Sequence, residues 1–124
     1  MTAIISRMNQ KLRAFELADQ LVLLVYEHTR EAPRSEQFGL TSQMRRAAVS
    51  VASNIVGGCA RYSQSDYCRF RDMAYGSARE VAYRVTLATR LGFIHVDSGK
   101  ALSTPAEETC RVLNGLIRSL RRES

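Results

Sequence analysis

The chain has 124 residues, 45% of them apolar and 24% charged, which is the composition of one globular domain and excludes a disordered chain. Its longest apolar run, Leu21 to Tyr26, is far shorter than the roughly 20 residues that a membrane-spanning helix needs. The net charge of +6 is mostly arginine, which suits phosphate and carboxylate ligands, although charge alone indicates nucleic-acid binding only weakly. We expect a cytoplasmic bacterial protein, because no apolar signal core follows the basic residues near the N-terminus.

Residues that carry catalytic or metal chemistry are few and scattered. Cys59, Cys68 and Cys110 form no C-x-x-C pair, so we expect reduced, packed thiols. His28 and His95 are far apart and belong to no zinc motif. We therefore predict no metal, no cofactor and no enzymatic activity.

The first predicted helix spans about residues 9–31 and ends before Pro33, because the residue before a proline avoids the α region. It carries two apolar stripes rather than one. They are Leu12, Phe15, Val22 and Tyr26, and Leu17, Leu21, Leu24 and His28. A helix with two stripes is buried on two sides, so the pattern predicts a partner subunit in addition to a core.

The second predicted helix spans about residues 40–57. We expect Thr41 or Ser42 to cap its N-terminus and Gly57-Gly58 to end it. The core stripe is Leu40, Met44, Ala47, Val51 and Ile55. The rest of the helix is rich in alanine and serine, so a neighbouring helix can approach closely.

The third predicted helix spans about residues 64–91. Ser63-x-x-Asp66 resembles a capping box at its start, and Gly92 is a natural C-terminal stop. One face carries the expected core positions, which are Tyr67, Phe70, Ala74, Ser77, Val81, Val85 and Ala88.

The fourth predicted helix runs from Asp97 or Ser98 to about Arg121. Its core positions are Leu102, Ala106, Thr109, Leu113, Leu116 and Leu120. Thr104-Pro105 is also a good helix start, so either a short helix precedes a restart or one helix kinks there; we favour one kinked helix. Short connections make successive helices antiparallel. The prediction is an all-α, up-down-up-down antiparallel four-helix bundle, one domain over residues 1–124 with an ordered core of about 9–121.

Two polar residues lie on apolar stripes and suggest a buried network. Asn54 lies beside Ile55 on the second helix, and Glu80 lies on the third. A buried carboxylate needs a partner because an isolated buried charge is costly. Arg45, Arg46 and Arg61 are the candidate partners, and the alternative is that Glu80 faces solvent.

Arginines recur along the third helix, with Tyr62 and Tyr67 near its start. They are Arg69, Arg71, Arg79, Arg84 and Arg90, with Arg61 just before the helix. Arginine and aromatic side chains together can hold phosphates and stack bases. A charged helix surface is more often solvated and paired at i,i+4, so RNA or DNA contact remains one of two alternatives.

One ordered set of residues is distinctive beyond composition. It consists of Gly39-Leu40-Thr41-Ser42-Gln43, Arg45-Arg46-Ala47-Ala48, Ser53-Asn54-Ile55, Gly58, Arg61, Ala74-x-Gly76-Ser77-x-x-Glu80 and Leu91-Gly92-Phe93-Ile94. The set resembles the four-helix-bundle family of bacterial proteins encoded in intervening sequences of the 23S ribosomal RNA gene. That family is similar to the accessory protein of diversity-generating retroelements. The resemblance extends from about Leu12 to Leu120. The chain departs from it at Gly57, where the family usually has Glu.

The resemblance implies a ring-like homo-oligomer, a pentamer, without enzymatic activity. For the retroelement relatives it also implies binding of nucleic acid and of a reverse transcriptase through a basic surface. Two functions follow. The first is an oligomeric scaffold that binds RNA or DNA through arginines. The second is a self-assembling structural or protein-interaction scaffold with no nucleic-acid role. Exposed, unpaired arginines would favour the first, and arginines paired with acidic neighbours the second.

Overall fold

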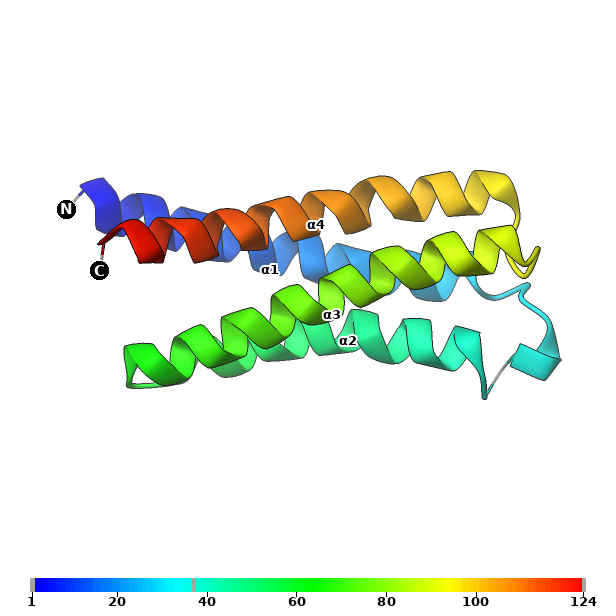
Figure 1. Cartoon of the computed structure of the whole chain (residues 1–124), viewed down its shortest axis with the longest axis horizontal. Coiled ribbons are helices and arrows are strands. Elements are labelled where there is room, and N and C mark those ends of the chain that lie inside the picture. The colour runs from blue at the N-terminus through cyan, green and yellow to red at the C-terminus, as the bar shows by residue number, and fades with distance from the viewer. Residues whose placement is uncertain (1, 37, 124) are drawn as a thin grey trace.

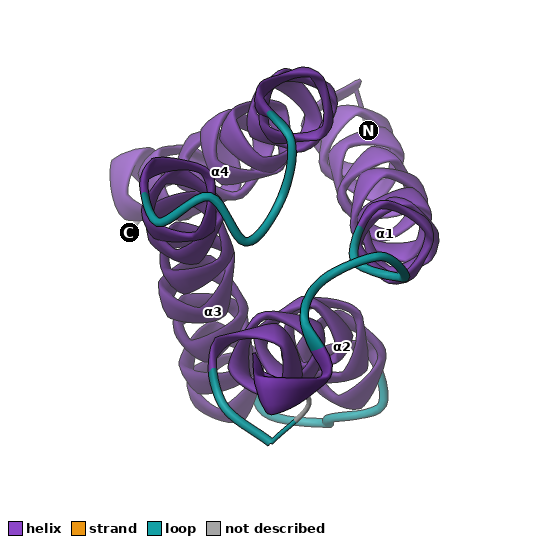
Figure 2. Ribbon diagram, turned by 90° about the vertical axis from the view of Figure 1, so that its right-hand side faces the viewer, coloured by secondary structure: helices purple, strands orange, loops and turns teal. Residues whose placement is uncertain are grey.

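Four helices form an antiparallel bundle in the computed structural model, which describes residues 2–36 and 38–123 and the side chains up to Ser119. The helices are α1 (Thr2–His28), α2 (Leu40–Cys59), α3 (Gln64–Arg90) and α4 (Val96–Glu123), with a short 3-10 turn at Arg34–Glu36. Both α1 and α3 pack against α2 and α4 (Figures 1 and 2). The predicted all-α, up-down-up-down fold is confirmed. None of the described helices is long and apolar enough to cross a membrane.

The centre of the bundle is built from small and medium-sized side chains. The largest fully buried ones include Leu21, Met44, Leu102 and Leu113. The predicted core stripe of α2 is confirmed, and in α3 and α4 most of the expected positions are buried. The exceptions on α3 are Tyr67, Phe70 and Ser77, which are half-buried. The Leu120 side chain lies outside the described residues.

The buried residues of α1 are Ala14, Ala18, Leu21 and Val25, of which only Leu21 belongs to a predicted stripe. Leu12 and Tyr26, both of the first predicted stripe, are exposed. Alanines let α1 approach its neighbours closely, so the larger apolar side chains of the helix point away from the centre. The helix also begins at Thr2 rather than near residue 9 and ends at His28.

The N-terminus of α2 is satisfied from outside the helix. Its N-cap is Gly39, which has no side chain to accept a hydrogen bond from the helix, and neither Thr41 nor Ser42 caps the helix instead. Instead, the Leu40 N–H donates to Glu36 Oε2 at 2.9 Å. The predicted cap was therefore wrong, because a carboxylate four residues upstream reaches the free N–H groups and complements the helix dipole.

The predicted end of α2 was wrong as well, because Gly57 and Gly58 lie inside the helix, which continues to Cys59. Both glycines face α3. A Cβ added at Gly57 would lie 2.9 Å from the Phe70 ring, and one at Gly58 would lie 3.0 Å from Phe70 Cβ. Their role is close helix packing rather than chain reversal. The Glu that the family usually carries at position 57 would require the Phe70 ring to move.

The signals at the ends of α3 are confirmed. Ser63 Oγ accepts the Asp66 N–H at 3.0 Å, and Gly92 adopts a φ of +75° just after the helix. α4 is continuous through Pro105, as predicted for a single helix, so no second helix restarts there. Thr109 Oγ1 donates to the Pro105 carbonyl at 2.8 Å and is fully buried.

Candidate functional site

The predicted buried network does not form, because Glu80 points outward from the bundle. Its side chain is 57% exposed and pairs with Arg84 one turn later, with 3.0 Å between Oε2 and Nη1. Arg84 also donates to the Gln43 carbonyl of α2. The alternative, in which Glu80 faces solvent, is the one the structure has.

The polar contact between α2 and α3 is made by two serines instead. Ser50 Oγ and Ser77 Oγ lie 2.8 Å apart. Asn54 Nδ2 donates to the Ser50 carbonyl at 2.9 Å and to Ser50 Oγ at 3.0 Å. Asn54 thus lies at the helix contact as predicted, but its partner is on its own helix. The small-residue surface of α2 was the available signal for this contact.

The three arginines assigned to the network lie in separate places. Arg45 Nε donates to Thr29 Oγ1 at 3.0 Å, and its guanidinium lies 4.7 Å from the centre of the Tyr26 ring. This links α2 to the end of α1. Arg46 is exposed on α2. Arg61 lies over the Phe70 ring at 4.4 Å. Arg45 and Arg61 therefore take part in different contacts, and neither of them contacts Glu80.

Most arginines proposed for nucleic-acid contact have acidic partners. The pairs are Arg69–Asp66, Arg71–Asp72, Arg79–Glu107 and Arg84–Glu80, while Arg90 is exposed in the last turn of α3. Glu108, beside Glu107, pairs across the bundle with Arg13 of α1. The two adjacent glutamates of α4 therefore bind two different helices, and the arginine surface of α3 is largely neutralised locally.

An apolar surface, which we call the α1–α2 face, lies on the outside of these two helices. It comprises Ile5, Leu12, Leu23 and Tyr26 of α1 with Val49 and Val56 of α2, all exposed. Leu12 and Leu23 are 57% and 66% exposed. Their spacing keeps them on one side of α1. The stacking of Arg45 on Tyr26 shows that this side adjoins α2. A single exposed leucine is ordinary, whereas several large apolar side chains exposed on one side of two neighbouring helices indicate an interaction surface.

A second apolar surface, the α3 face, lies on the outside of α3. Met73 and Tyr83 are exposed there, ten residues apart, and Gly76 lies between them. A Cβ at Gly76 would meet nothing within 4 Å. Position 76 is therefore open to solvent on the exterior of the helix. The α3 face differs in residues and shape from the α1–α2 face.

The scattered chemical groups stay scattered in the fold. His28 Nδ1 lies 3.1 Å from Ser98 Oγ, and His95 contacts Asp97, both at the end of the bundle where α1 and α3 finish (Figure 1). Cys59 and Cys68 flank the α2–α3 turn at the opposite end. In the part of the chain that the structure describes, no three His, Cys, Asp or Glu side chains are placed to hold a metal ion.

The fold and its packing define a protein of the all-α four-helix-bundle class. The family model for the 23S rRNA-intervening sequence protein matches residues 10–115, and the chain belongs to this family. The resemblance noted in the sequence is thereby confirmed.

A solved structure shows the same fold. It is a protein of unknown function from the S23 ribosomal protein family of Bacteroides thetaiotaomicron, with a TM-score of 0.72 and 21% sequence identity. The match covers 90% of this chain and 97% of that one. No curated protein matches the chain significantly.

Proposed function

We propose that this protein is a non-enzymatic, self-associating scaffold whose copies cover one another's α1–α2 face. The exposed Leu12 and Leu23 on that face carry the proposal. Burying a leucine side chain fully is worth about 1.5–3 kcal/mol, so leaving several large apolar groups in water is costly. We choose a second copy of the chain as the partner that covers this face, because such a copy is always present together with the first.

The two apolar faces are unlike each other, and this favours a ring. A twofold dimer buries the same patch on both subunits, whereas a contact between two different patches repeats head to tail and closes into a ring. The α1–α2 face offers exposed leucines, and the α3 face offers Met73 and Tyr83 with the side-chain-free Gly76 between them in sequence. The pentamer implied by the family resemblance is one such closed ring.

The paired arginines of α3 favour the scaffold over the nucleic-acid alternative. A side chain such as Arg79 or Arg84 that already contacts a carboxylate must give up that contact to bind phosphate. These ion pairs are mostly surface-exposed and individually weak. The preference for the scaffold over nucleic-acid binding therefore rests on the number of pairs rather than on the strength of each.

The test is a double substitution in the α1–α2 face, Leu12→Gln with Leu23→Gln, followed by sedimentation velocity. Removing apolar burial from both positions should weaken the subunit contact at least tenfold, since about 1.4 kcal/mol corresponds to that factor. Leu91→Gln is the matched control, because Leu91 is equally exposed but lies in the α3–α4 turn. An unchanged sedimentation coefficient in the double variant, or an equal loss in the control, contradicts the proposal. Helical circular dichroism checks that both variants remain folded.

A further inference from the structure

Two exposed carboxylates interrupt the apolar side of α1. They belong to a row of residues that we call the outer stripe, which consists of Leu12, Glu16, Asp19 and Leu23, all exposed. The spacing of four, three and four residues keeps the row on one side of the helix. The outer stripe is therefore acidic at its centre and apolar at its two ends.

The carboxylates of the outer stripe lack partners within their own chain. Neither Glu16 nor Asp19 forms an ion pair or a side-chain hydrogen bond with any described residue. The other carboxylates whose side chains are described contact a cation or a helix N-terminus, except Glu27 and Glu31 near the end of α1. Like charges one turn apart repel each other, so the stripe favours a positively charged partner.

These charges disfavour a twofold contact between two outer stripes. In an antiparallel pair of α1 helices centred between Glu16 and Asp19, the four carboxylates of the two copies would meet. Like charges placed together across an interface are costly, so the stripe should face a different surface of a second copy. Such a contact joins unlike patches and repeats head to tail.

A groove between α2 and α3, which we call the α2–α3 groove, offers a surface of the complementary kind. Its volume is about 370 Å³, and it lies between the start of α2 and the C-terminal half of α3. Leu40, Tyr83 and Leu87 are its apolar residues, and Tyr83 is 62% exposed. Arg84 joins the two helices there, because its Nη1 donates to the Gln43 carbonyl. The groove therefore has apolar walls that a leucine of another copy can cover.

Arginines without carboxylate partners lie beside this groove. Arg46 follows Gln43 by one turn of α2, and Arg90 follows Leu87 by one turn of α3. Both are exposed, and neither forms an ion pair within the described ranges of the chain. The arginines that line the groove itself already contact glutamates. The charge left unpaired is thus positive at the groove and negative on the outer stripe, and such complementarity orients two surfaces.

We propose that the outer stripe of one copy docks into the α2–α3 groove of a second copy, with Glu16 and Asp19 facing the unpaired arginines. The leucines at the ends of the stripe pack against the apolar walls of the groove. This inference rests on the proposed self-association and names the surface that receives the α1–α2 face. Each copy carries one stripe and one groove, so successive copies join in the same way around a ring.

Charge reversal with sedimentation velocity tests whether the two surfaces meet. Glu16→Arg with Asp19→Arg should weaken self-association about tenfold, and so should Arg46→Glu with Arg90→Glu. Neither pair of substitutions breaks an ion pair among the described residues. All four substitutions in one chain restore opposite charges across the contact and should recover most of the loss.

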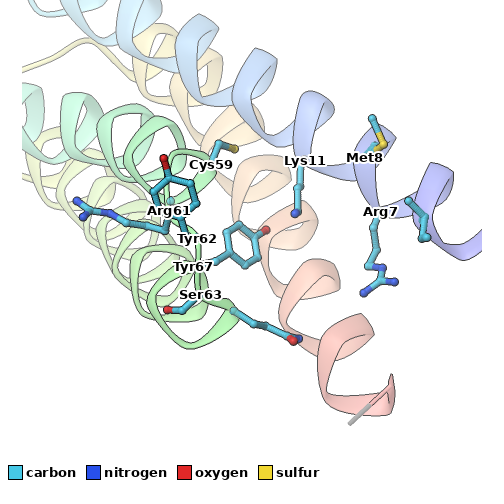
Figure 3. A pocket seen from close by; sticks show the side chains of 11 residues that line it. Arg7, Met8, Lys11, Cys59, Arg61, Tyr62, Ser63 and Tyr67 are labelled. Atoms are coloured by element: carbon cyan, nitrogen blue, oxygen red, sulfur yellow. The ribbon is translucent and has the colours of Figure 1, made fainter.

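Two matched controls separate this contact from general effects of charge. Glu27→Arg with Glu31→Arg changes the net charge equally but lies at the end of the bundle, and should leave self-association unchanged. Tyr83→Glu puts a negative charge in the groove and should weaken self-association about tenfold. Tyr62→Glu should have no effect, because Tyr62 is fully exposed beside a separate pocket at the α2–α3 turn (Figure 3).

A mixing experiment distinguishes this docking from self-association by another route. The Leu12→Gln, Leu23→Gln variant keeps its groove and the Tyr83→Glu variant keeps its stripe, so a mixture should form a pair with one chain of each. Absence of this pair, an equal loss in a control, or no recovery in the fourfold variant overturns the docking and leaves the proposed self-association standing. An unmodified protein that is monomeric at every concentration contradicts both. Circular dichroism verifies that each variant is folded.

Discussion

Gly99 of α4 packs closely against Thr89 of α3, and its replacement by alanine should destabilise the fold. A Cβ at Gly99 would lie 2.3 Å from Thr89 Oγ1 and 3.1 Å from Thr89 Cγ2. Thr89 cannot turn aside freely, because it is β-branched and its hydroxyl donates to the Val85 carbonyl at 2.8 Å. The start of α4 must therefore move away from α3, or the hydroxyl must give up its bond.

The expected magnitude follows from three opposing contributions. Glycine to alanine inside a helix ordinarily gains about 1 kcal/mol. Overpacking at a close contact costs about 1–3 kcal/mol, and losing the Thr89 hydrogen bond costs about 1 kcal/mol more. The gain and the hydrogen-bond loss nearly cancel, so we expect Gly99→Ala to lower the free energy of unfolding by about 1–3 kcal/mol. Gly115→Ala is the matched control on the same helix, because a Cβ there meets nothing within 4 Å and should raise stability.

Urea unfolding followed by circular dichroism measures both variants. Protein concentration must be the same throughout, because self-association contributes to apparent stability. Thr89→Ala in the Gly99→Ala background removes the two closest atoms and should recover part of the loss, which a double-mutant cycle reports. If Gly99→Ala proves as stable as Gly115→Ala, the close approach of α3 and α4 is incorrect.

Three further predictions concern single side chains. Glu80→Gln should change the free energy of unfolding by less than about 0.5 kcal/mol, because the exposed pair with Arg84 is weak; a loss of several kcal/mol in a urea titration would restore the buried-network hypothesis. The pKa of Tyr67 is raised to about 12 in the folded chain, against about 10 when unfolded. This difference stabilises the fold fully below pH 10, and the stabilisation is lost as pH rises toward 12. Tyr67→Phe should flatten the decline in stability over that interval, and an equally steep decline in the variant would contradict this. Cys110 is buried, and burial raises the pKa of its thiol, so iodoacetamide should modify it at least tenfold more slowly than exposed Cys59; mass mapping that finds equal rates would refute the burial.

The helix positions could be predicted because their signals are local. Ser63 caps α3 through its own first turn, and Gly92 ends the helix with a left-handed conformation. Such features depend on residues a few positions apart and need no knowledge of the tertiary structure. The glycines at 57 and 58 misled the prediction, because their role depends on Phe70 of another helix.

The core of α1 could not be assigned from periodicity alone. Leu12 and Leu21 belong to the two predicted apolar stripes, yet only Leu21 is fully buried. Periodicity identifies an apolar side but does not say whether it faces the chain's own core or another surface. Close helix approach selects small residues, so the larger apolar side chains lie outside.

The candidate network failed for a different physical reason. Glu80 was matched with arginines of other segments, whereas an arginine four residues later on its own helix pairs with it. That i,i+4 relation was readable from the sequence. The contact between Lys11 and the Tyr67 ring was not readable in this way, since it joins α1 to α3 across the bundle. Only the packing of α1 beside the α2–α3 turn brings those residues together.

Light scattering of the unmodified protein across a dilution series tests the central claim most directly. The account predicts a particle whose mass is a whole multiple, greater than one, of the 13.9 kDa chain and that persists as the sample is diluted. A mass of 13.9 kDa at every concentration would mean that water alone covers the α1–α2 face, and the proposed scaffold would be wrong.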